Sequence, residues 1–560
     1  MSTSLHRQDA GHRSADRMTI MPKAGDDPLR AELLKPENLR RRYERIRTQR
    51  GAWEALWQDC YDYSLPARRP SSAGMGGAAG RVSERLFDAT AADAAEQLAA
   101  TLLAQLTPPW SRWFAFRPGR DVPQDKHGSM SSELDRVAEL LQAQFDRSNL
   151  AVELHQAMLD LVVAGTACLA CEEAPLGEAS AFRFSAVPLN DLALDESGSG
   201  RIDIVFRRQD LSLEHLAQRY PALQQQSWFA ARLQREPEAR LGLLDCLLPA
   251  PAPQQGYLFA TVLEDGALDE QTRLLTAGRF EQAPFIAFRW LKAPGEVYGR
   301  SPVMKALPDI KTANKVVELV LKNASIAVTG IWQADDDGVL NPANVKLVPG
   351  AIIPKAVGSS GLTPLAAPGR FDISQIVLDD LRARIRHALL ADRLGQIDAP
   401  RMTATEVMER AAEMARQLGA TFGRLQSELL TPLVMRAVAI LQRRGEIPRF
   451  ALDGREVALV QQSPLARLQA QGDVQGVLSW LQQLQALGPA ALQVVDSVAV
   501  ARWLGRTLGV PGEFLIEAGE APVGTAGAAA LPPQLAQLAP QLQQMLQHLA
   551  GAQPSAGVTP

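Results

Sequence analysis

The residue types that most often do chemistry are present in this 560-residue sequence, but they form no recognisable constellation. The seven histidines are scattered, and there is no GxxxxGKS/T phosphate-binding loop, no GxSxG nucleophile turn and no HExxH zinc motif. Acidic pairs such as Glu172-Glu173 occur, yet nothing distinguishes them from surface carboxylates. The sequence therefore predicts a protein without catalytic residues and without a cofactor. A hidden enzyme is the less favoured alternative.

Cysteines and a run of aspartates are the remaining candidates for metal chemistry. The four cysteines are Cys60, Cys168, Cys171 and Cys246. They are too few for a disulfide scaffold in a chain this long, which fits a reducing cytosol. Cys168 and Cys171 form a lone CxxC inside the apolar run 161–171, which predicts a buried strand rather than a zinc or redox site. The aspartates at 335–337 lack the other ligand positions of a calcium loop, so they predict a solvated turn and no metal site.

Basic side chains recur at helical spacing in two long segments. The first, residues 296–327, contains Gly-Arg-Ser-Pro, in which Ser301 can cap a helix and Pro302 suits its first position. Apolar residues then recur with a period near 3.6, which predicts a helix over 302–327. One face of that helix carries Glu318 and three lysines, Lys311, Lys315 and Lys322. Two interpretations stay open with equal weight, a solvated outer face and a face turned toward a polyanion.

The second basic segment, residues 374–392, predicts another helix. It carries three arginines, Arg382, Arg384 and Arg386, which acidic residues of the same segment largely balance. A loop at 393–402 follows, and three of its side chains could meet phosphates: Arg393, Gln396 and Arg401. The whole chain has a formal net charge of -4. Balanced charge argues against a protein that binds nucleic acid tightly.

The elements that position these residues are predicted from hydrophobic periodicity. At this length we expect about two to four subdomains in a mainly helical α+β fold. Helices are predicted from Pro36 to Pro66 and over 83–107, 131–163, about 211–234, 403–444 with a kink at Thr431-Pro432, and within an all-helical module over 464–519. Strands are predicted over 180–187, 202–208, 257–263, 284–291 and within 449–461.

An aromatic cluster and the two ends of the chain complete the pattern. Trp110, Trp113, Phe114 and Phe116 follow a double proline, and we favour a core position for them over stacking on bases. Residues 1–35 predict a disordered arm, and 521–560 predict a low-complexity linker with a leucine-striped helix. There is no apolar signal core, and no apolar run approaches the roughly 18 residues of a membrane span. We therefore expect a soluble protein without membrane association.

Several stretches together carry a resemblance to a known family. Besides 296–327, they are SERLFDATAADAAEQLAATLLAQLTPPWSRWFAF at 83–116, RMTATEVMERAAEMARQLGATFGRLQSELLTPLVMRAVAILQRRGEIP at 401–448, and SPLAR at 463–467 with VVDSVAVARWLGRTLGVP at 494–511. In this order they resemble the portal, or head-to-tail connector, proteins of short-tailed double-stranded-DNA bacteriophages. The similar blocks cover most of residues 40–515, and neither terminal tail shares the resemblance.

The resemblance implies a portal fold assembled as a ring. Its parts in this chain are a disordered arm (1–35), an α+β wing (36–300), a first stem helix (301–327), a small β-rich clip (328–373), a second stem helix (374–392), a tunnel loop (393–402), a wing helix and return strand (403–462), a helical crown (463–520), and a linker with a C-terminal helix (521–560). The basic and polar side chains named on the stem helices and the tunnel loop become candidates to face a DNA channel.

The function that the resemblance implies is a dodecameric channel at one capsid vertex, through which double-stranded DNA is packaged and ejected. Its expected partners are other copies of the chain, double-stranded DNA without sequence preference, the terminase large subunit, tail adaptors, and the major capsid and scaffolding proteins. We expect it in the virion after assembly in the bacterial cytoplasm. The alternatives are a nucleic-acid-processing enzyme of the particle and a self-associating scaffold or adaptor without a channel.

Overall fold

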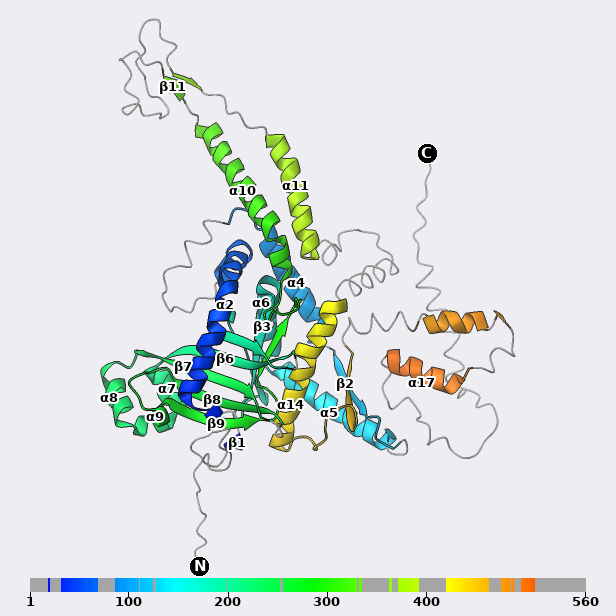
Figure 1. Cartoon of the computed structure of the whole chain (residues 1–560). Coiled ribbons are helices and arrows are strands. Elements are labelled where there is room, and N and C mark those ends of the chain that lie inside the picture. Colours follow the sequence, from blue (N-terminus) through cyan, green and yellow to red (C-terminus); the bar gives the residue numbers. More distant parts are fainter. Residues whose placement is uncertain are drawn as a thin grey trace, which may run out of the picture.

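The computed structural model describes residues 19–20, 32–68, 86–109, 111–123, 127–198, 200–251, 255–329, 332–334, 362–364, 371–391, 419–462, 474, 476–484, 486–487 and 495–508. Within these ranges the protein is mixed helix and sheet, so the α+β class is confirmed. A body of sheets and helices carries a long, narrow arm at one end (Figure 1).

The largest sheet of the body is antiparallel and has the strand order β1-β9-β8-β7-β6-β5. Its strands are β1 (Thr19–Ile20), β5 (Leu192–Glu196), β6 (Ile202–Ser212), β7 (Arg240–Pro249), β8 (Tyr257–Leu263) and β9 (Leu274–Phe280). Even-numbered residues of β7, such as Leu244 and Cys246, pack under Tyr43 and Ile46 of the helix that crosses this face. Leu247 points to the main core, as the alternation of a strand requires.

Two smaller sheets lie beside the large one. One has the order β10-β3-β4, with β10 (Phe285–Arg289) pairing Phe285 with Ala170 of β3 (Thr166–Glu173), and with β4 (Phe182–Ala186) on the other side. The other pairs β2 (Phe114–Pro118) with β13 (Val457–Gln461). Because Trp113, Phe114 and Phe116 are buried beside these strands, the core position expected for them is confirmed. Trp110 lies outside the described residues.

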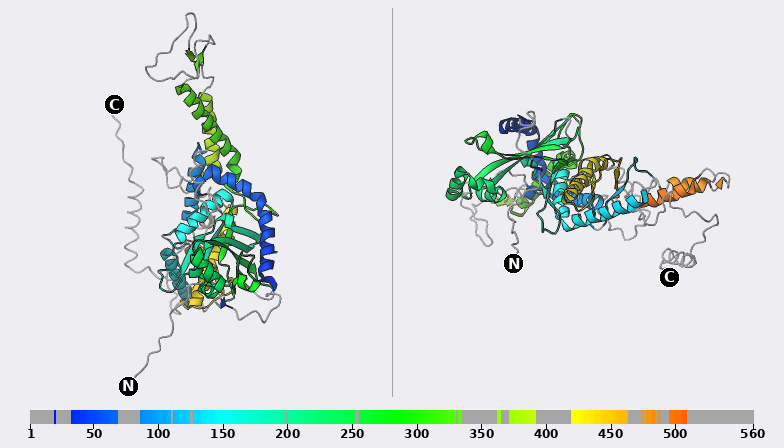
Figure 2. Two further views of the ribbon diagram at one scale, coloured as in Figure 1. Left: turned by 90° about the vertical axis from the view of Figure 1, so that its left-hand side faces the viewer. Right: turned by 90° about the horizontal axis from the view of Figure 1, so that it is seen from below.

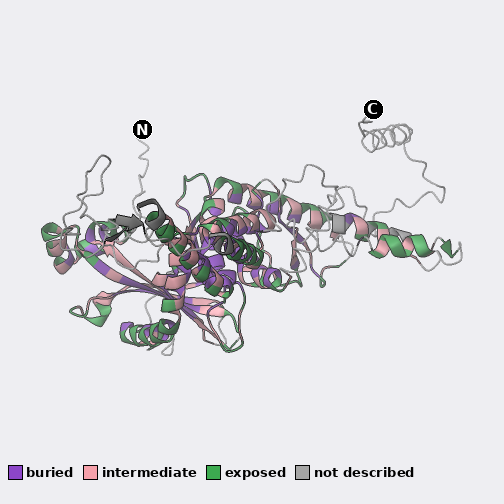
Figure 3. Cartoon of the chain, turned by 90° about the horizontal axis from the view of Figure 1, so that it is seen from above, coloured by how far each residue is buried: buried purple, intermediate pink, exposed green. Residues whose placement is uncertain are grey.

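Helices cover both faces of the sheets and supply most of the main core. They are α2 (Pro36–Ser64), α4 (Thr90–Leu106), α5 (His127–Arg147), α6 (Leu150–Ala164), α7 (Leu213–Arg219), α8 (Ser227–Arg235), α9 (Glu270–Arg273) and α14 (Thr431–Arg444), with the short turns η1 (Pro66–Arg68), η3 (Leu189–Asp191), η4 (Pro221–Gln225) and the π-helical η6 (Gln426–Leu430). Helix α17 (Ser497–Leu508) is the last described element. Buried residues concentrate in the body between sheets and helices (Figure 3).

The arm consists of α10 (Pro302–Thr329) and α11 (Phe371–Ala388), which pack along one another. At its tip, β11 (Trp332–Ala334) pairs antiparallel with β12 (Leu362–Pro364). The 28 residues of α10 correspond to a length of roughly 42 Å. Two views at right angles show the arm projecting well beyond the body (Figures 1 and 2).

Several predicted elements have different boundaries in the structure. Helix α4 begins only at Thr90, because Asn314 accepts hydrogen bonds from the backbone N–H groups of residues 87 and 88 and holds them outside the helix. The helix predicted over 131–163 is two helices, since the Asn149 side chain bonds both backbone groups of Phe184 at the break. Residues 161–164 of the apolar run are helical. Gly165 then ends α6 in the left-handed region, at φ 77°, and β3 follows.

Other elements were missed or divided. Strands β5, β7 and β9 were not predicted, and the helix expected over 211–234 is three short pieces separated at Tyr220 and Gln226. Strand β1 lies at the edge of the large sheet, with Thr19 opposite Arg279. Part of the N-terminal segment 1–35, which was predicted to be disordered, therefore forms a short strand there. Among the described residues, no helix is both long and apolar enough to cross a bilayer.

Candidate functional site: the two-helix arm and its root

The root of the arm is built by the Gly-Arg-Ser-Pro motif at 299–302, where backbones approach closely. A Cβ on Gly299 would lie 2.2 Å from the carbonyl oxygen of Gly165, so only glycine fits without movement. The N–H of Gly299 donates to the Thr166 hydroxyl at 2.8 Å. Ser301 accepts from the N–H of Met304 at 2.9 Å, which confirms the predicted cap. Its hydroxyl also donates to the carbonyl of Val163 at 2.8 Å, which joins the start of α10 to the end of α6.

A short segment, residues 86–89, which we call the strap, connects both arm helices to the body. From α10, the Asn314 amide oxygen accepts from the N–H groups of Phe87 (2.7 Å) and Asp88 (3.1 Å). From α11, Arg382 donates to the Asp88 carboxylate at 2.8 Å. Burial raises the pKa of Asp88, but the hydrogen bonds from Thr90 and Arg382 outweigh it and hold the pKa below its usual 3.8. The strap therefore fixes the two helices relative to α4.

Two more of the predicted channel residues have carboxylate partners within the chain. Lys311 donates to Asp59 of α2 at 2.6 Å and lies 5.5 Å from the ring centroid of Tyr63. Arg384 of α11 donates to Asp309 of α10 at 3.0 Å, which joins the two arm helices. These contacts give Lys311, Arg382 and Arg384 structural roles at the base of the arm that the sequence pattern did not indicate.

The outer part of the lysine face is a neutralised cluster on α10. Glu318 accepts from Lys315 at 3.0 Å and from Lys322 at 2.6 Å, spacings of three and four residues. Hydrogen bonds from Lys322 and then Lys315 lower the pKa of Glu318. The two lysine side chains are 64% and 61% exposed, for Lys322 and Lys315 respectively, so their charge remains accessible.

The remaining predicted channel residues are one on α11 and three in the following loop. Arg386 is exposed on α11, near the body end of the arm. Arg393, Gln396 and Arg401 lie outside the described residues, as do the aspartates at 335–337 and the helix start at 403.

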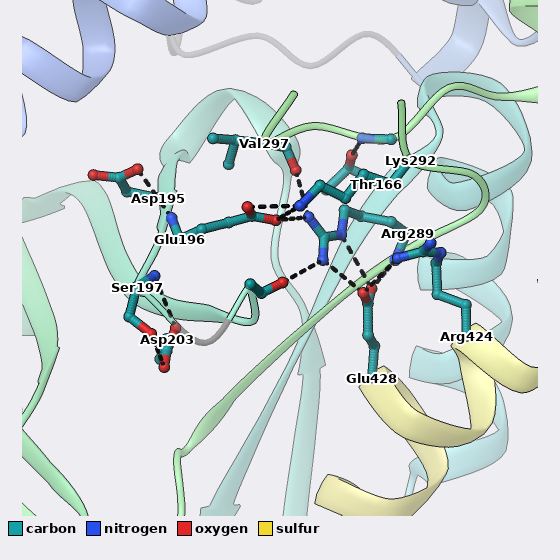
Figure 4. A network of polar contacts seen from close by, with 12 residues as sticks. Thr166, Asp195, Glu196, Ser197, Asp203, Arg289, Lys292, Val297, Arg424 and Glu428 are labelled. Atoms are coloured by element: carbon teal, nitrogen blue, oxygen red, sulfur yellow. Dashed lines mark hydrogen bonds and ion pairs between the residues drawn. The ribbon is translucent and has the colours of Figure 1, made fainter. Parts of the chain in front are cut away.

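A buried ion-pair network lies where the chain enters and leaves the arm (Figure 4). Arg289 at the end of β10 is fully buried and donates to Glu428 of η6 through Nη2 at 2.6 Å and Nε at 3.2 Å. Its other terminal nitrogen donates to Glu196 of β5 and to the carbonyl of Val297. Lys292 also donates to Glu196, at 2.6 Å. We call Arg289, Glu428, Glu196, Lys292 and Arg424 the Arg289 network.

Hydrogen bonds within the network shift the pKa of Arg289 and of Glu196 toward their charged states. Burial lowers the pKa of Arg289, but the hydrogen bonds to Glu428 and Glu196 outweigh burial and raise it. Likewise, burial raises the pKa of Glu196, while Lys292 and Arg289 lower it overall. Sequence reasoning missed this network, because Arg289 lies 93 residues from Glu196 and 139 residues from Glu428. The only available signal was an arginine in the apolar run of β10.

The cysteines do not form a site. Cys168 and Cys171 are three residues apart on β3, so they point to opposite faces of the strand. All four cysteines are buried and none is in a disulfide, and burial raises the pKa of Cys60 and of Cys168 to about 12. Within the described ranges, no group of three or more histidine, cysteine or acidic residues is placed to hold a metal ion.

The described residues thus present an arm whose root is tied to the body by hydrogen bonds and ion pairs. Residues 36–515 match the family model described as bacteriophage head to tail connecting protein. The chain belongs to this family. The family is a structural connector, not an enzyme, which agrees with the sequence prediction.

Curated relatives are similar over most of their length. The "Probable portal protein" of Bordetella phage BPP-1 is 24% identical over 516 residues, covering 87% of this chain and 90% of that protein. The "Portal protein" of Salmonella phage epsilon15 is 23% identical, covering 82% and 85%. The "Portal protein" of Escherichia phage T7 is 22% identical, covering 73% and 75%. These relatives support a portal role for a connector of the short-tailed phage type.

Proposed function

We propose that this chain is the subunit of a dodecameric portal ring at one capsid vertex, through which double-stranded DNA enters and leaves the head. The observation that carries the proposal is the two-helix arm, in a member of a head-to-tail connecting family. A long helical pair that projects from a body is a suitable wall for a channel, because repeated copies around an axis enclose a pore.

The charge pattern of the arm supports passage rather than retention of DNA. Lys311, Arg382 and Arg384 have carboxylate partners, and Glu318 partly neutralises Lys315 and Lys322. Each cation that neutralises a phosphate adds affinity through counterion release, so a strongly basic lining would slow sliding. Near-neutral helices with a few exposed lysines avoid that cost, and no single position is expected to be essential.

The remaining parts follow from the same proposal. Residues 328–373 form the narrow outer end of the ring, where β11 and β12 are too short to be a stable sheet alone and pair with strands of neighbouring subunits. The loop 393–402 projects into the channel and contacts phosphates through Arg393, Gln396 and Arg401. The ring binds the terminase large subunit during packaging and tail adaptors afterwards, and capsid and scaffolding proteins surround it in the virion.

Complementation is the experiment that tests this function. A phage of the corresponding type that lacks its own portal gene is supplied with this chain from a plasmid. The account predicts heads filled with DNA, measured by nuclease-protected genome, when the chain is supplied together with its cognate capsid and terminase proteins. Empty heads with normal amounts of assembled ring would contradict it and favour a scaffold without a channel.

A further inference from the structure

The Arg289 network joins, through charged groups, the chain that departs for the arm at its root and the chain that comes back into the body. The departing chain runs from Arg289 through Lys292 and Val297 to the start of α10 at Pro302. The returning chain is described from residue 419, and Glu428 lies in its π-helical turn. Arg289 and Glu428 are 139 residues apart in sequence, and the arm is built between them.

Both carboxylate oxygens of Glu428 accept hydrogen bonds from Arg289 in the departing chain. Its Oε2 accepts from both the backbone N–H (3.0 Å) and the Nε (3.2 Å) of Arg289, and its Oε1 accepts from Nη2 at 2.6 Å. This two-point pairing fixes the orientation of the carboxylate as well as its distance. Arg424, one turn earlier in the returning chain, donates to the same Oε1 at 3.1 Å.

The departing chain is held to the same centre from its other side. Arg289 donates to the carbonyl of Val297 at 3.0 Å, and Lys292 holds both oxygens of Glu196 at 2.6 and 2.7 Å. Ser197, next to Glu196, donates to Asp203 at 2.7 Å and fixes the β5–β6 turn that presents Glu196. The arginine side chain is therefore the common partner of β10, the segment leading to α10, and η6.

The π-helical turn is the second feature of the junction. A π-helical turn accommodates one extra residue in a helix and is often found at functional sites. Here it contains Glu428 together with the fully buried Leu429 and Leu430. The wider turn lets the carboxylate reach Arg289 while the next two leucines stay in the core.

We propose that the Arg289 network makes residues 289–300 and 419–430 one cooperative unit. The root of the arm and the first described part of the returning chain then unfold locally together and not separately. A buried ion pair adds little net stability compared with apolar packing, but loss of one partner leaves an uncompensated buried charge. Such a network is therefore suited to specifying one arrangement of two segments. Neither segment can shift without breaking contacts of the other.

Hydrogen exchange on the assembled full-length protein tests this. Glu428→Gln keeps the size of the side chain and removes its charge. The proposal predicts that amides of both 290–300 and 419–430 exchange about tenfold faster or more, because opening either segment now costs less. The matched control is Glu173→Gln, which removes a carboxylate of similar burial that pairs with Arg443 of α14 at 2.9 Å, away from the arm root. It should leave both segments within about twofold of the unmodified chain.

The alternative is that the pair is only local packing. Faster exchange in 419–430 with unchanged exchange in 290–300 would overturn the proposal. If Glu428→Gln does not assemble, Arg424→Gln provides the same comparison, because Arg424 is 30% exposed and donates to Oε1 of Glu428, which also accepts from Arg289. For Arg424→Gln the proposal predicts a smaller increase in amide exchange rate that is still equal in the two segments. An increase confined to 419–430 would again contradict cooperativity.

A second measurement distinguishes coupling from general loosening. Asn314→Ala disturbs the arm at the strap, at a residue outside the Arg289 network. The proposal predicts that Asn314→Ala alone speeds amide exchange in 419–430. In a chain that already carries Glu428→Gln, adding Asn314→Ala should change the exchange of 419–430 little. Additive effects of the two substitutions on 419–430 would show that the network does not join the segments.

Discussion

Gly299 is the residue whose identity the structure explains most completely. A Cβ there would meet the Gly165 oxygen at 2.2 Å and the Arg289 Cβ at 2.9 Å, and the first contact is with backbone that cannot move freely. We predict that Gly299→Ala lowers the free energy of unfolding by at least about 2 kcal/mol, measured by chemical denaturation.

The control for this prediction is Gly51→Ala in α2. A Cβ on Gly51 meets nothing within 4 Å, and alanine is the better helix former, so the variant should be more stable by about 1 kcal/mol. If Gly299→Ala were as stable as the unmodified protein, the close backbone approach between Gly299 and Gly165 at the arm root would be contradicted.

Charge pairs at the arm differ sharply in their burial, and their predicted effects differ with it. Asp88 is 4% exposed, so Arg382→Ala leaves a buried carboxylate without its guanidinium and should cost about 1 to 3 kcal/mol. Lys315 is 61% exposed, so Lys315→Ala should change the free energy of unfolding by less than about 0.5 kcal/mol.

Both variants are compared by denaturant unfolding and by packaged DNA. If Arg382→Ala and Lys315→Ala lowered the free energy of unfolding equally, the structural role assigned to Arg382 and not to Lys315 would be contradicted. Loss of ring assembly in Lys315→Ala would rule out the channel-facing role proposed for that lysine.

The Asp88 carboxylate also predicts a pH dependence. Its folded pKa is lowered below 3.8, so its contribution to stability is fully present above pH 3.8 and is lost as the pH falls through the lower folded value. The difference in unfolding free energy between the unmodified chain and Asp88→Asn should therefore be largest near neutral pH and shrink below pH 3.8. A difference that stayed constant down to pH 2 would show that the charge of Asp88 is irrelevant to the strap.

At the scale of elements, the sequence predicted best where apolar periodicity is long and uninterrupted. The helix predicted over 302–327 is α10, Pro302–Thr329, and its serine cap is confirmed. At Thr431-Pro432, where a kink was expected, the π-helical η6 gives way to α14, and the kink itself stays a prediction. Local spacing and the capping serine were sufficient to predict α10.

The elements that were missed depend on partners far away in sequence. Strand β7 is a central strand of the large sheet and is buried on both faces, so it lacks the alternation that marks a half-exposed strand. Its buried Asp245 is satisfied by Gln209 and Thr261 of the neighbouring strands. The strap and the Arg289 network were unpredictable for the same reason, because their contacts join residues tens to hundreds of positions apart.

The loop at 393–402 is tested by deletion. From the sequence we expect Gly395 to loosen this loop, and Asp398-Ala399-Pro400 to prevent the next helix from extending backward into it. Deleting residues 395–399 should leave ring assembly intact but reduce retention or movement of DNA, measured as nuclease-protected genome length. Normal packaging and retention of full-length genomes by the deletion variant would make the loop a simple connector.

At the scale of the whole molecule, the arm and the body have different surfaces. The body buries most of its apolar residues between sheets and helices and exposes a few, such as Val152 and Leu176, whereas four large apolar side chains are exposed along the outer part of the arm: Leu319, Leu321, Ile376 and Val377. In a single copy of the chain these four side chains remain exposed to solvent. Neighbouring copies in a ring would cover them, so the exposed arm is consistent with the proposed assembly.

The central claim is that copies of this chain close into a ring whose pore is lined by the arms. Electron microscopy of the purified full-length protein tests it most directly. The account predicts closed rings with a central pore, twelve subunits around the axis, and α10 and α11 of every subunit arranged around the pore. Monomers, open filaments, or closed rings in which the arms point away from the pore would contradict the account.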